Sequence, residues 1–459
     1  MQAPEITNKS DAGSDEPRAP RYAFYVVGVV AAATFLSNLD QAVLPTVAAS
    51  IQAEFRITDT QIGVLVSAFT ISLALAAMPI GYLADRRTRR TILGLGLTVW
   101  SLATLVTGLT RAFPQMLAAR AVLGIGEATA MPVGASLISD YFPRRSRGRA
   151  MAVVVLAINL GLGVGSIAAG AVGLRLGWRW AFYFAAGPGL LLSVLAFTLR
   201  EPLRGAAEKR GPKLAMARDS GLRAFARLFR IRSYAAAVAA MVCGGLAIGA
   251  LQFIALYLHR RFGVNIAQAG ALFGIPLLLG AVVGTPTIGW LLDWRSRRSL
   301  RAPVEVGFVG MLVCGLAATV MFSARSVAVF EPAMVVFAFV STAAIVAPFV
   351  VFQNVILPSL RASAASMANT IVKLSGFALG PLAVGFVSDL AHHDLGLSLL
   401  LLTPTALLAA SACMALALPS MKGDVEAMEE NWTRHESLQQ RLVSTVPLEH
   451  ESVGAANRA

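Results

Sequence analysis

The sequence predicts an all-α membrane protein whose twelve transmembrane helices form two pseudo-symmetric six-helix bundles. Of its 459 residues, 56% are hydrophobic and 14% are charged, whereas a soluble domain carries about 25% charged residues. Twelve apolar stretches are long enough to cross the roughly 30 Å hydrocarbon core of a bilayer. A charged motif after the second stretch recurs after the eighth. Each stretch must be helical, because backbone groups in lipid have no water to bind.

The predicted spans follow from a search for runs of about 20 mostly apolar residues. They cover residues 22–49, 60–84, 91–110, 113–139, 148–174, 179–199, 234–260, 268–292, 303–324, 329–357, 363–389 and 395–419. They divide the chain into a disordered N-terminus (1–20), an N-terminal bundle (21–199), a basic linker (200–233), a C-terminal bundle (234–419) and a polar tail (420–459). In the tail we expect disorder or one short helix around Val425–Leu442.

Basic residues gather in alternate loops. Arginines cluster after spans two, four and eight and in the linker, while the opposite loops carry few. By the positive-inside rule, the linker and both termini are cytoplasmic, in a multi-pass protein of the cell (inner) membrane. Within the linker, Leu222–Ile231 alternates apolar residues and arginine at helical spacing, which predicts an amphipathic helix on the inner membrane surface. A merely solvated linker is the alternative.

Several function classes find no support in the sequence. The net charge of +14 lies in short loop clusters and not on a soluble basic module, which argues against a nucleic-acid partner. The three cysteines lie in apolar stretches without metal-ligand spacing, so we expect no metal. No P-loop, nucleophile elbow or H-E-x-x-H motif occurs, so we expect no enzyme activity and no cofactor. If the chain is a transporter, the absence of a P-loop argues against ATP as its energy source, and we expect a proton gradient to drive it.

A repeated motif indicates a duplicated transporter. Gly81-Tyr-Leu-Ala-Asp85-Arg86-Arg-Thr-Arg89-Arg90 follows span two, and Gly289-Trp-Leu-Leu-Asp293-Trp-Arg-Ser-Arg297-Arg298 follows span eight. The Gly, Leu, Asp and Arg pairs coincide at one constant offset, as in transporters built from internal repeats. The motif resembles the signature loop of the major facilitator superfamily, and with two six-helix halves the resemblance covers nearly the whole chain. It implies the major facilitator fold.

Further motifs in the first half resemble the Spinster branch of that superfamily. They are Leu39-Asp40, Thr60-Gln61-Ile62-Gly63, Arg120-Ala-Val-Leu-Gly124-Ile-Gly126-Glu127-Ala128, and Gly177-Trp-Arg-Trp-Ala-Phe-Tyr183 with Pro188-Gly189. That branch is associated with proton-linked movement of lysophospholipids and sphingolipid-like amphiphiles, which the resemblance therefore implies here. One departure is that the family commonly has arginine after the aspartate of helix one, where this chain has Gln41.

The short list of ionisable candidates inside the predicted spans is Asp40, Arg120, Glu127 and Lys373. Each costs roughly 2.5–3.5 kcal/mol to insert and is a functional candidate by default. Arg120 and Glu127 share one face of helix four, offset by about 10 Å along its axis. Asp40 lies at about the depth of Arg120, so we expect these two to pair and Glu127 to exchange a proton near mid-membrane. The alternative is a purely structural ion pair. Lys373 either snorkels to the cytoplasm or contacts substrate.

The loop motif has a different predicted role, that of a cytoplasmic gate. Asp85 and Arg89, with Asp140, would latch the halves together in the outward-open state and separate when the protein opens inward. The second copy would act in the same way, more weakly because Trp294 replaces a basic residue. The predicted gate set is Gly81, Asp85, Arg86, Arg89, Arg90, Asp140, Asp293, Arg297 and Arg298.

Two further residue sets concern helix packing and the substrate pocket. Glycines in spans five and eleven should permit close helix approach and bending: Gly161, Gly163, Gly165, Gly170, Gly376, Gly380 and Gly385, with Pro381. The possible lining of an amphiphile cavity is Met131, Phe349, Phe352, Gln353 and Asn354, together with Lys373. For the first five, ordinary packing is the alternative.

The leading hypothesis is a monomeric, proton-coupled transporter of an amphipathic or anionic substrate, working by alternating access amid membrane lipids. Efflux or uptake of organic anions or drugs by the same fold is the second hypothesis. Drug–proton antiporters of the superfamily commonly carry Gly-Pro in helix five, where this chain has Gly165-Ser166. A non-transporting sensor or a membrane-embedded enzyme is a remote third, since both gate motifs are intact.

Overall fold

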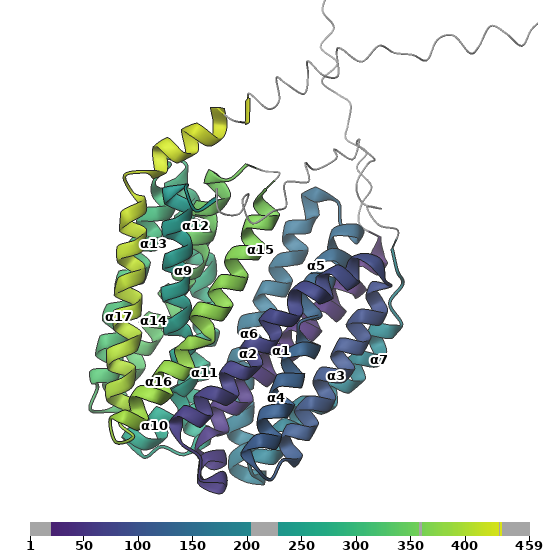
Figure 1. The fold of residues 1–459 in the computed structure, drawn as a ribbon, viewed down its shortest axis with the longest axis vertical. Helices are drawn as coiled ribbons and strands as arrows, with labels where there is room; N and C mark the ends of the chain where they lie inside the picture. Colours follow the sequence, from purple (N-terminus) through teal and green to yellow (C-terminus); the bar gives the residue numbers. More distant parts are fainter. Residues whose placement is uncertain (1–19, 203–227, 358–359, 431, 434–459) are drawn as a thin grey trace, which may run out of the picture.

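In the computed structural model, residues 20–202, 228–357, 360–430 and 432–433 are described, and they contain helices and no strands (Figure 1). Twelve helical stretches are long and apolar enough to cross a membrane, which confirms the predicted fold class. The first six make up the N-terminal half. Its helices are α1 (Arg21–Phe55), α2 (Asp59–Arg86), α3 (Arg89–Leu109), α4 (Phe113–Glu127), α5 (Ala130–Tyr141), α6 (Arg144–Leu176) and α7 (Trp178–Phe197).

The C-terminal half contains the other six spans, several of them interrupted. Its elements are α9 (Arg232–Ala250), η1 (Leu251–Phe253), α10 (Ile254–Phe262), α11 (Ile266–Leu279), η2 (Gly280–Gly284), α12 (Thr285–Ser296), α13 (Ala302–Ser323), α14 (Val327–Val355), α15 (Arg361–Val372), η3 (Lys373–Phe377), α16 (Leu379–Leu390) and α17 (Leu395–Ala417). Residues 421–430 form a further helical run. The expected disorder at 1–20, most of the linker helix and most of the tail fall outside the described residues.

The repeat is visible again where the second span of each half begins. Thr58 and Gln61 form a capping box at the start of α2, each side chain bonding the backbone N–H of the other. Asn265 and Gln268 form the same reciprocal box at the start of α11. Such boxes satisfy amide groups that a helix leaves unpaired in its first turn. Both halves therefore define this helix start by the same local chemistry.

Four spans depart from a continuous α-helix. Span four breaks between α4 and α5, directly after Glu127, and span seven contains the 3₁₀ turn η1. Spans eight and eleven contain the π-helical segments η2 and η3. Irregular turns of this kind often mark functional sites. By contrast α6 runs unbroken from Arg144 to Leu176.

Glycines let α6 pack against one helix of its own half and one helix of the other half. An added Cβ at Gly161 would collide with the carbonyl oxygen of Phe35, and one at Gly165 would lie 2.7 Å from the carbonyl oxygen of Leu39, both on α1. A Cβ at Gly163 would lie 3.0 Å from the carbonyl oxygen of Gly274 on α11. Gly161 and Gly165 thus face α1 of the same half, and Gly163 faces α11 of the other half. The absence of side chains lets α6 pack closely on both helices.

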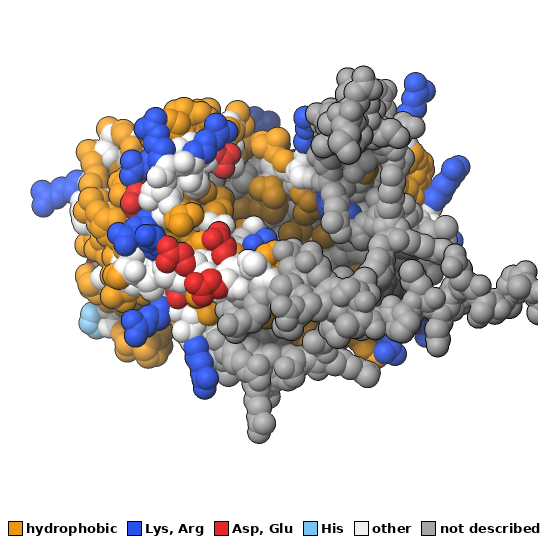
Figure 2. Space-filling model, turned by 90° about the horizontal axis from the view of Figure 1, so that it is seen from above, with side chains coloured by type: hydrophobic (Ala, Val, Ile, Leu, Met, Phe, Trp, Pro, Cys, Tyr) orange, Lys and Arg blue, Asp and Glu red, His pale blue; other side chains and the backbone are white. Residues whose placement is uncertain are grey.

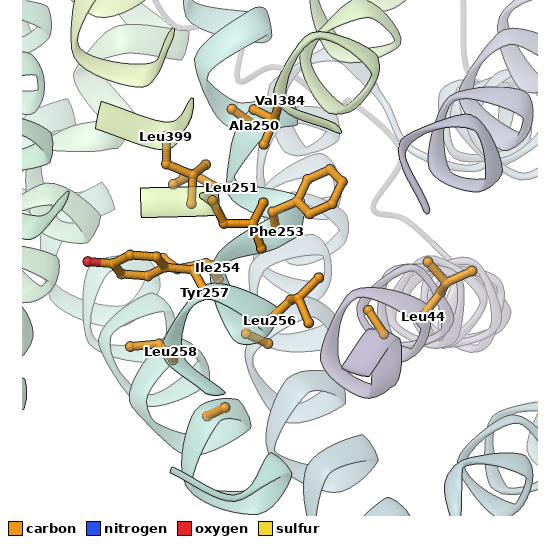
Figure 3. Close-up of a cluster of buried hydrophobic side chains, with 14 of the residues drawn as sticks. Leu44, Ala250, Leu251, Phe253, Ile254, Leu256, Tyr257, Leu258, Val384 and Leu399 are labelled. Atoms are coloured by element: carbon orange, nitrogen blue, oxygen red, sulfur yellow. The ribbon is translucent and has the colours of Figure 1, made fainter. Parts of the chain in front are cut away.

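In the part of the chain that the structure describes, the two halves share a hydrophobic core at one end only. We call the end where α1 begins and α17 finishes the terminal end, and the opposite end the closed end. One buried cluster contains residues of both halves, including Leu44 of α1 and Leu256 of α10, and Figure 3 shows part of it. Two other large clusters, nearer the terminal end, each belong to a single half. The halves are therefore joined at the closed end.

Hydrogen bonds between the halves follow the same pattern. Among the described residues, the one that lies farthest from the closed end joins Ser67 Oγ of α2 to the carbonyl oxygen of Ala378, at 2.6 Å. The others join residues around Asp59 to the ends of α10 and α16. Figure 2 looks onto the terminal end and shows basic side chains around its rim and recessed hydrophobic side chains near its centre.

The Gly161 contact generates a stability prediction. Gly161→Ala should lower the free energy of unfolding by about 1–3 kcal/mol, because the new methyl group meets backbone of α1 that cannot rotate away. Denaturant unfolding in detergent micelles measures the effect. Gly148→Ala, in the same helix with nothing within 4 Å of the added Cβ, is the matched control and should be neutral or slightly stabilising. Equal loss in both variants would contradict the packing interpretation.

Candidate functional site

A buried carboxylate lies where span four breaks. Glu127 is the last residue of α4, and only 7% of its surface is exposed. Its Oε1 accepts hydrogen bonds from Ser37 Oγ and Gln41 Nε2 of α1, while Oε2 has no partner among the described residues. Ser37 and Gln41 are four residues apart and so lie on one face of α1. Sequence reasoning missed both donors, although that spacing around Asp40 was a usable signal.

One turn of α1 also supplies an acid to the arginine of α4. Asp40 is fully buried and Arg120 is 3% exposed, with Nη1 of Arg120 3.9 Å from Oδ2 of Asp40. Trp100 Nε1 approaches the same oxygen at 3.4 Å, and the ring of Phe182 lies 5.4 Å from the guanidinium carbon. The expected Asp40–Arg120 neighbourhood is therefore present, at the long limit of an ion pair.

The guanidinium retains unused donors. Nε and Nη2 of Arg120 have no hydrogen-bond partner among the described residues. A buried charged group without partners is costly, and such sites commonly hold water or a ligand. Arg120 thus retains donors and Glu127 retains an acceptor, both buried and without a hydrogen-bond partner among the described residues.

The C-terminal half contributes a cation to the same region. Lys373 is partly buried and is the first residue of the π-helical segment η3. Its charge interacts electrostatically with that of Glu127, across the boundary between the halves. The described structure shows no salt bridge within 4 Å for Lys373, so its ammonium group keeps donors for another partner.

The predicted pocket residues differ in environment. Met131 is 49% exposed and Phe349 is 41% exposed, while Gln353 and Asn354 are partly buried. Phe352 is 1% exposed and packs edge-on against Tyr234 and Phe349 within a core cluster of the C-terminal half. Its environment is that of a core residue.

At the terminal end, the first gate motif is organised around Arg89. This side chain is 2% exposed and pairs with Asp140 and, at 2.7 Å, with Glu201. It also donates to Ser136 Oγ at 2.9 Å. Glu201 additionally accepts from the backbone N–H of Arg90 at 3.2 Å. All of these groups belong to the N-terminal half, and the part played by Glu201 was not anticipated from the sequence.

Two further gate arginines stack on aromatic side chains of their own half. Arg86 stacks on Tyr82, and Arg298 stacks on Trp294, with the guanidinium carbon 4.2 and 4.4 Å from the ring centres. Asp293 and Arg297 are exposed. Gly81 has open space where a Cβ would stand. The side chain of Asp85 falls outside the described residues. The described partners of each copy of the motif therefore lie in the same half as that copy. The two halves are joined at the closed end in this conformation.

A second charged network, absent from the sequence predictions, lies at the closed end. Asp59 is fully buried at the start of α2, and Arg260 of α10 donates to both of its oxygens at 2.8 Å. Ser388 Oγ of α16 and Gln52 Nε2 of α1 donate to Asp59 at 2.6 and 2.7 Å. The network therefore links the halves through one buried carboxylate.

Asp389, at the end of α16, completes this link by capping a helix of the other half. Its two oxygens accept the backbone N–H groups of Asp59 at 3.1 Å and Thr60 at 2.9 Å. A carboxylate at a helix N-terminus is stabilising, because the first amides are unpaired and the helix dipole is positive there. Sequence reasoning missed this contact because α2 and α16 are far apart in the chain.

Comparisons with known proteins agree with this architecture. Residues 30–381 match the Major Facilitator Superfamily. The chain is 30% identical to the sphingosine-1-phosphate transporter SPNS2 of Mus musculus over 379 residues, which are 78% of this chain and 68% of that protein. It is 26% identical to the probable L-galactonate transporter of Escherichia coli (strain K12) over 305 residues, which are 63% of this chain and 66% of that protein.

A solved structure supports the fold. The crystal structure of a bacterial homologue of the human lysosomal transporter Spinster, inward-facing and unoccupied, superposes with a TM-score of 0.74. The two sequences are 22% identical, and the match covers 89% of this chain and 98% of that chain. The similarity confirms the twelve-helix architecture predicted from the repeat.

The Asp40–Arg120 pair generates a prediction. Asp40→Asn and Arg120→Met should each lower the free energy of unfolding by about 3–5 kcal/mol, because each leaves one buried charge without its partner. The double variant should lose less than either single variant. Denaturant unfolding of all four proteins in micelles measures the interaction.

The Glu54–Arg179 pair is the control. Its side chains are 44% and 31% exposed, so a parallel cycle should give a coupling of about 0–1 kcal/mol. Strict additivity of the Asp40 and Arg120 variants would show that the two groups do not stabilise each other.

Proposed function

Because the chain belongs to the major facilitator superfamily of membrane transporters, we propose that it is a proton-coupled carrier that moves an amphipathic substrate by alternating access. It is a multi-pass membrane protein and a transporter, not an enzyme. We infer that it lies in the inner membrane with its terminal end in the cytoplasm, since the basic loops gather there. In that orientation the described state is inward-facing.

The observation that carries the proton coupling is the environment of Glu127. A carboxylate inside a membrane bundle is costly when ionised, and such groups serve as proton relays in transporters. Here one oxygen is held by Ser37 and Gln41 and the other is free. The free oxygen can take up a proton without breaking either hydrogen bond. Because Glu127 ends α4, a change in its charge acts directly on the break in span four.

Two cations, one from each half, interact electrostatically with Glu127, which favours a substrate that carries an anionic group. Arg120 in the N-terminal half has two unused donor nitrogens, and Lys373 in the C-terminal half has no ion-pair partner in the described structure. An anion placed between them would contact both halves at once. Apolar residues such as Met131 and Phe349 would take the substrate's hydrocarbon part. The relative SPNS2, a sphingosine-1-phosphate transporter, is consistent with such an amphiphile.

Transport of a small organic anion is the second candidate function. The similarity to a probable L-galactonate transporter favours it, because the two cations would bind a sugar-acid carboxylate by the same chemistry. The two candidates differ in what the apolar surface contributes: an amphiphile needs it, and a sugar acid does not.

Alternating access requires that the terminal end closes when the other end opens. The Arg89–Asp140–Glu201 cluster and the second motif around Asp293 lie at the terminal end of their respective halves. We propose that these two motif regions meet in the outward-open state and act there as the cytoplasmic latch. In the inward-facing state Arg89 of the first motif pairs with Asp140 and Glu201, and Arg298 of the second stacks on Trp294.

Uptake into proteoliposomes tests the role of Glu127. Labelled lysophospholipid uptake should rise with an imposed pH gradient, and Glu127→Gln should reduce the gradient-driven part by about tenfold or more, because glutamine cannot exchange a proton. Glu331→Gln removes an exposed carboxylate and is the matched control. Full gradient stimulation in Glu127→Gln would reject Glu127 as the carrier. No lipid uptake by folded wild type, with uptake of a sugar acid, would favour the second function.

A substitution of Lys373 tests the anion contact. Lys373→Gln should raise the KM for an anionic lysophospholipid by about tenfold, the loss expected for one charged hydrogen bond. The KM for a zwitterionic analogue should change less. Lys422→Gln, at an exposed lysine paired with Glu426, is the control and should leave both unchanged. Equal loss for both lipids would show that Lys373 acts on folding or on conformational change and not on the anionic group.

A further inference from the structure

The closed-end network contains a titratable side chain, His393, that the proposed transport mechanism does not use. His393 lies in the turn between α16 and α17, with 60% of its side chain exposed. Its Nδ1 is 3.0 Å from Oδ1 of Asp389 and 3.8 Å from Oδ2 of Asp59. One exposed imidazole therefore faces two carboxylates, one from each half of the protein.

The charges around this imidazole do not balance when it is neutral. The groups that face it are Asp389 of α16, Asp59 of α2 and Arg260 of α10, whose Nη1 also lies 3.4 Å from the carbonyl oxygen of His393. The neighbouring Asp394 instead caps α17 through the N–H of Leu397. Two carboxylates and one guanidinium leave one net negative charge at the junction. Protonated His393 cancels that charge.

The backbone holds the imidazole in this place. His392 and His393 both have positive φ angles, 55° and 67°, which are uncommon for residues other than glycine. The N–H of His393 donates to the carbonyl oxygen of Ser388 at 2.7 Å. Ser388 in turn donates to Asp59. Unfavourable backbone conformations persist where the surroundings determine them, and they concentrate at switch regions.

We propose that Asp59, Arg260, Asp389 and His393 form an acid-strengthened latch that holds the two halves together at the closed end. The Asp59–Arg260 pair and the capping of α2 by Asp389 supply the part that is independent of pH near neutrality. Protonation of His393 makes its contact with Asp389 charge-assisted and adds an electrostatic attraction to Asp59 at 3.8 Å, which favours the closed-end-shut conformation. Loss of that proton weakens the junction. This inference rests on the alternating access of the proposed function, but not on Glu127 or on any substrate.

A metal-centred junction fits these side chains less well. The ligand atoms of Asp59, Asp389 and His393 lie within 4.8 Å of one another. However, Arg260 and Ser388 already occupy the Asp59 oxygens, and backbone amides occupy those of Asp389. A divalent cation would also meet the guanidinium charge. We therefore interpret the group as an ion-pair network.

Distance measurements by electron paramagnetic resonance test the latch. Spin labels at Ala53→Cys and Arg325→Cys, both exposed and on different halves at the closed end, report its opening in the full chain. Cys243, Cys314 and Cys413 are replaced by alanine, and Glu127→Gln removes the other proposed proton site. In nanodiscs, the ratio of the short-distance to the long-distance population should rise about two- to five-fold from about pH 8 to about pH 5.5.

Two adjacent histidines provide a matched pair of variants. His393→Asn should abolish the pH response, whereas His392→Asn should keep it; asparagine tolerates the positive φ of both positions. Asp59→Asn should reduce the short-distance population at both pH values. A pH response that survives in His393→Asn overturns the proposal, as does one that a metal chelator removes. No change with pH while Asp59→Asn still opens the closed end also overturns it, and leaves alternating access intact. Distances unaffected by every variant would likewise overturn the latch, whereas a failure of alternating access would appear as loss of uptake by the wild type.

Discussion

In the hydrocarbon core of a membrane, a polar group that lacks a partner within the protein has no water to replace it. This constraint explains why every span is helical and where the charged residues lie. Asp40 and Arg120 lie side by side, Glu127 is held by two donors of α1, and Arg89 is enclosed by Asp140 and Glu201. Each of these charged groups has at least one partner within residues 21–201. The groups that remain unsatisfied, on Arg120 and Glu127, mark the place where a substrate or a proton can act.

The fold was predictable from the sequence because its signals are local. An apolar run defines a span, arginine clusters define loop sides, and the Asp85 and Asp293 motifs define the repeat. The interruptions at Ala128, Leu251, Gly280 and Lys373 were not predicted, since a π-helical segment changes the turn but not the composition of a span. Ser37, Gln41 and Glu201 were missed for another reason. Their roles depend on how helices rotate against each other, which hydropathy does not encode.

The candidate site was predictable only in part, and the closed end shows why. Buried charges such as Glu127 attract notice because they interrupt apolar sequence. Asp59 and Asp389 lie at helix ends, where acidic residues are common, and only the packing of α2 against α16 gives them a shared role. Phe352 illustrates the same limit: the sequence left open whether it lines a pocket or packs in the interior, and its surroundings are those of a core. The roles of Asp59, Asp389 and Phe352 all depend on how segments that are far apart in the sequence pack against each other.

The apolar cluster shared by the halves has a thermodynamic consequence. Leu44 and Leu256 belong to one buried apolar cluster that both halves share while the closed end is shut, and part of that cluster must be exposed to water when the end opens. Exposing apolar area raises the heat capacity. Unless the terminal end buries an equal apolar area in exchange, the two conformations differ in heat capacity. The free-energy difference between them, and so the ratio of their populations, then varies non-linearly with temperature. Similar apolar areas at the two ends of the protein would cancel this heat-capacity difference. The balance between the apolar areas buried at the two ends therefore determines how strongly the transport cycle depends on temperature.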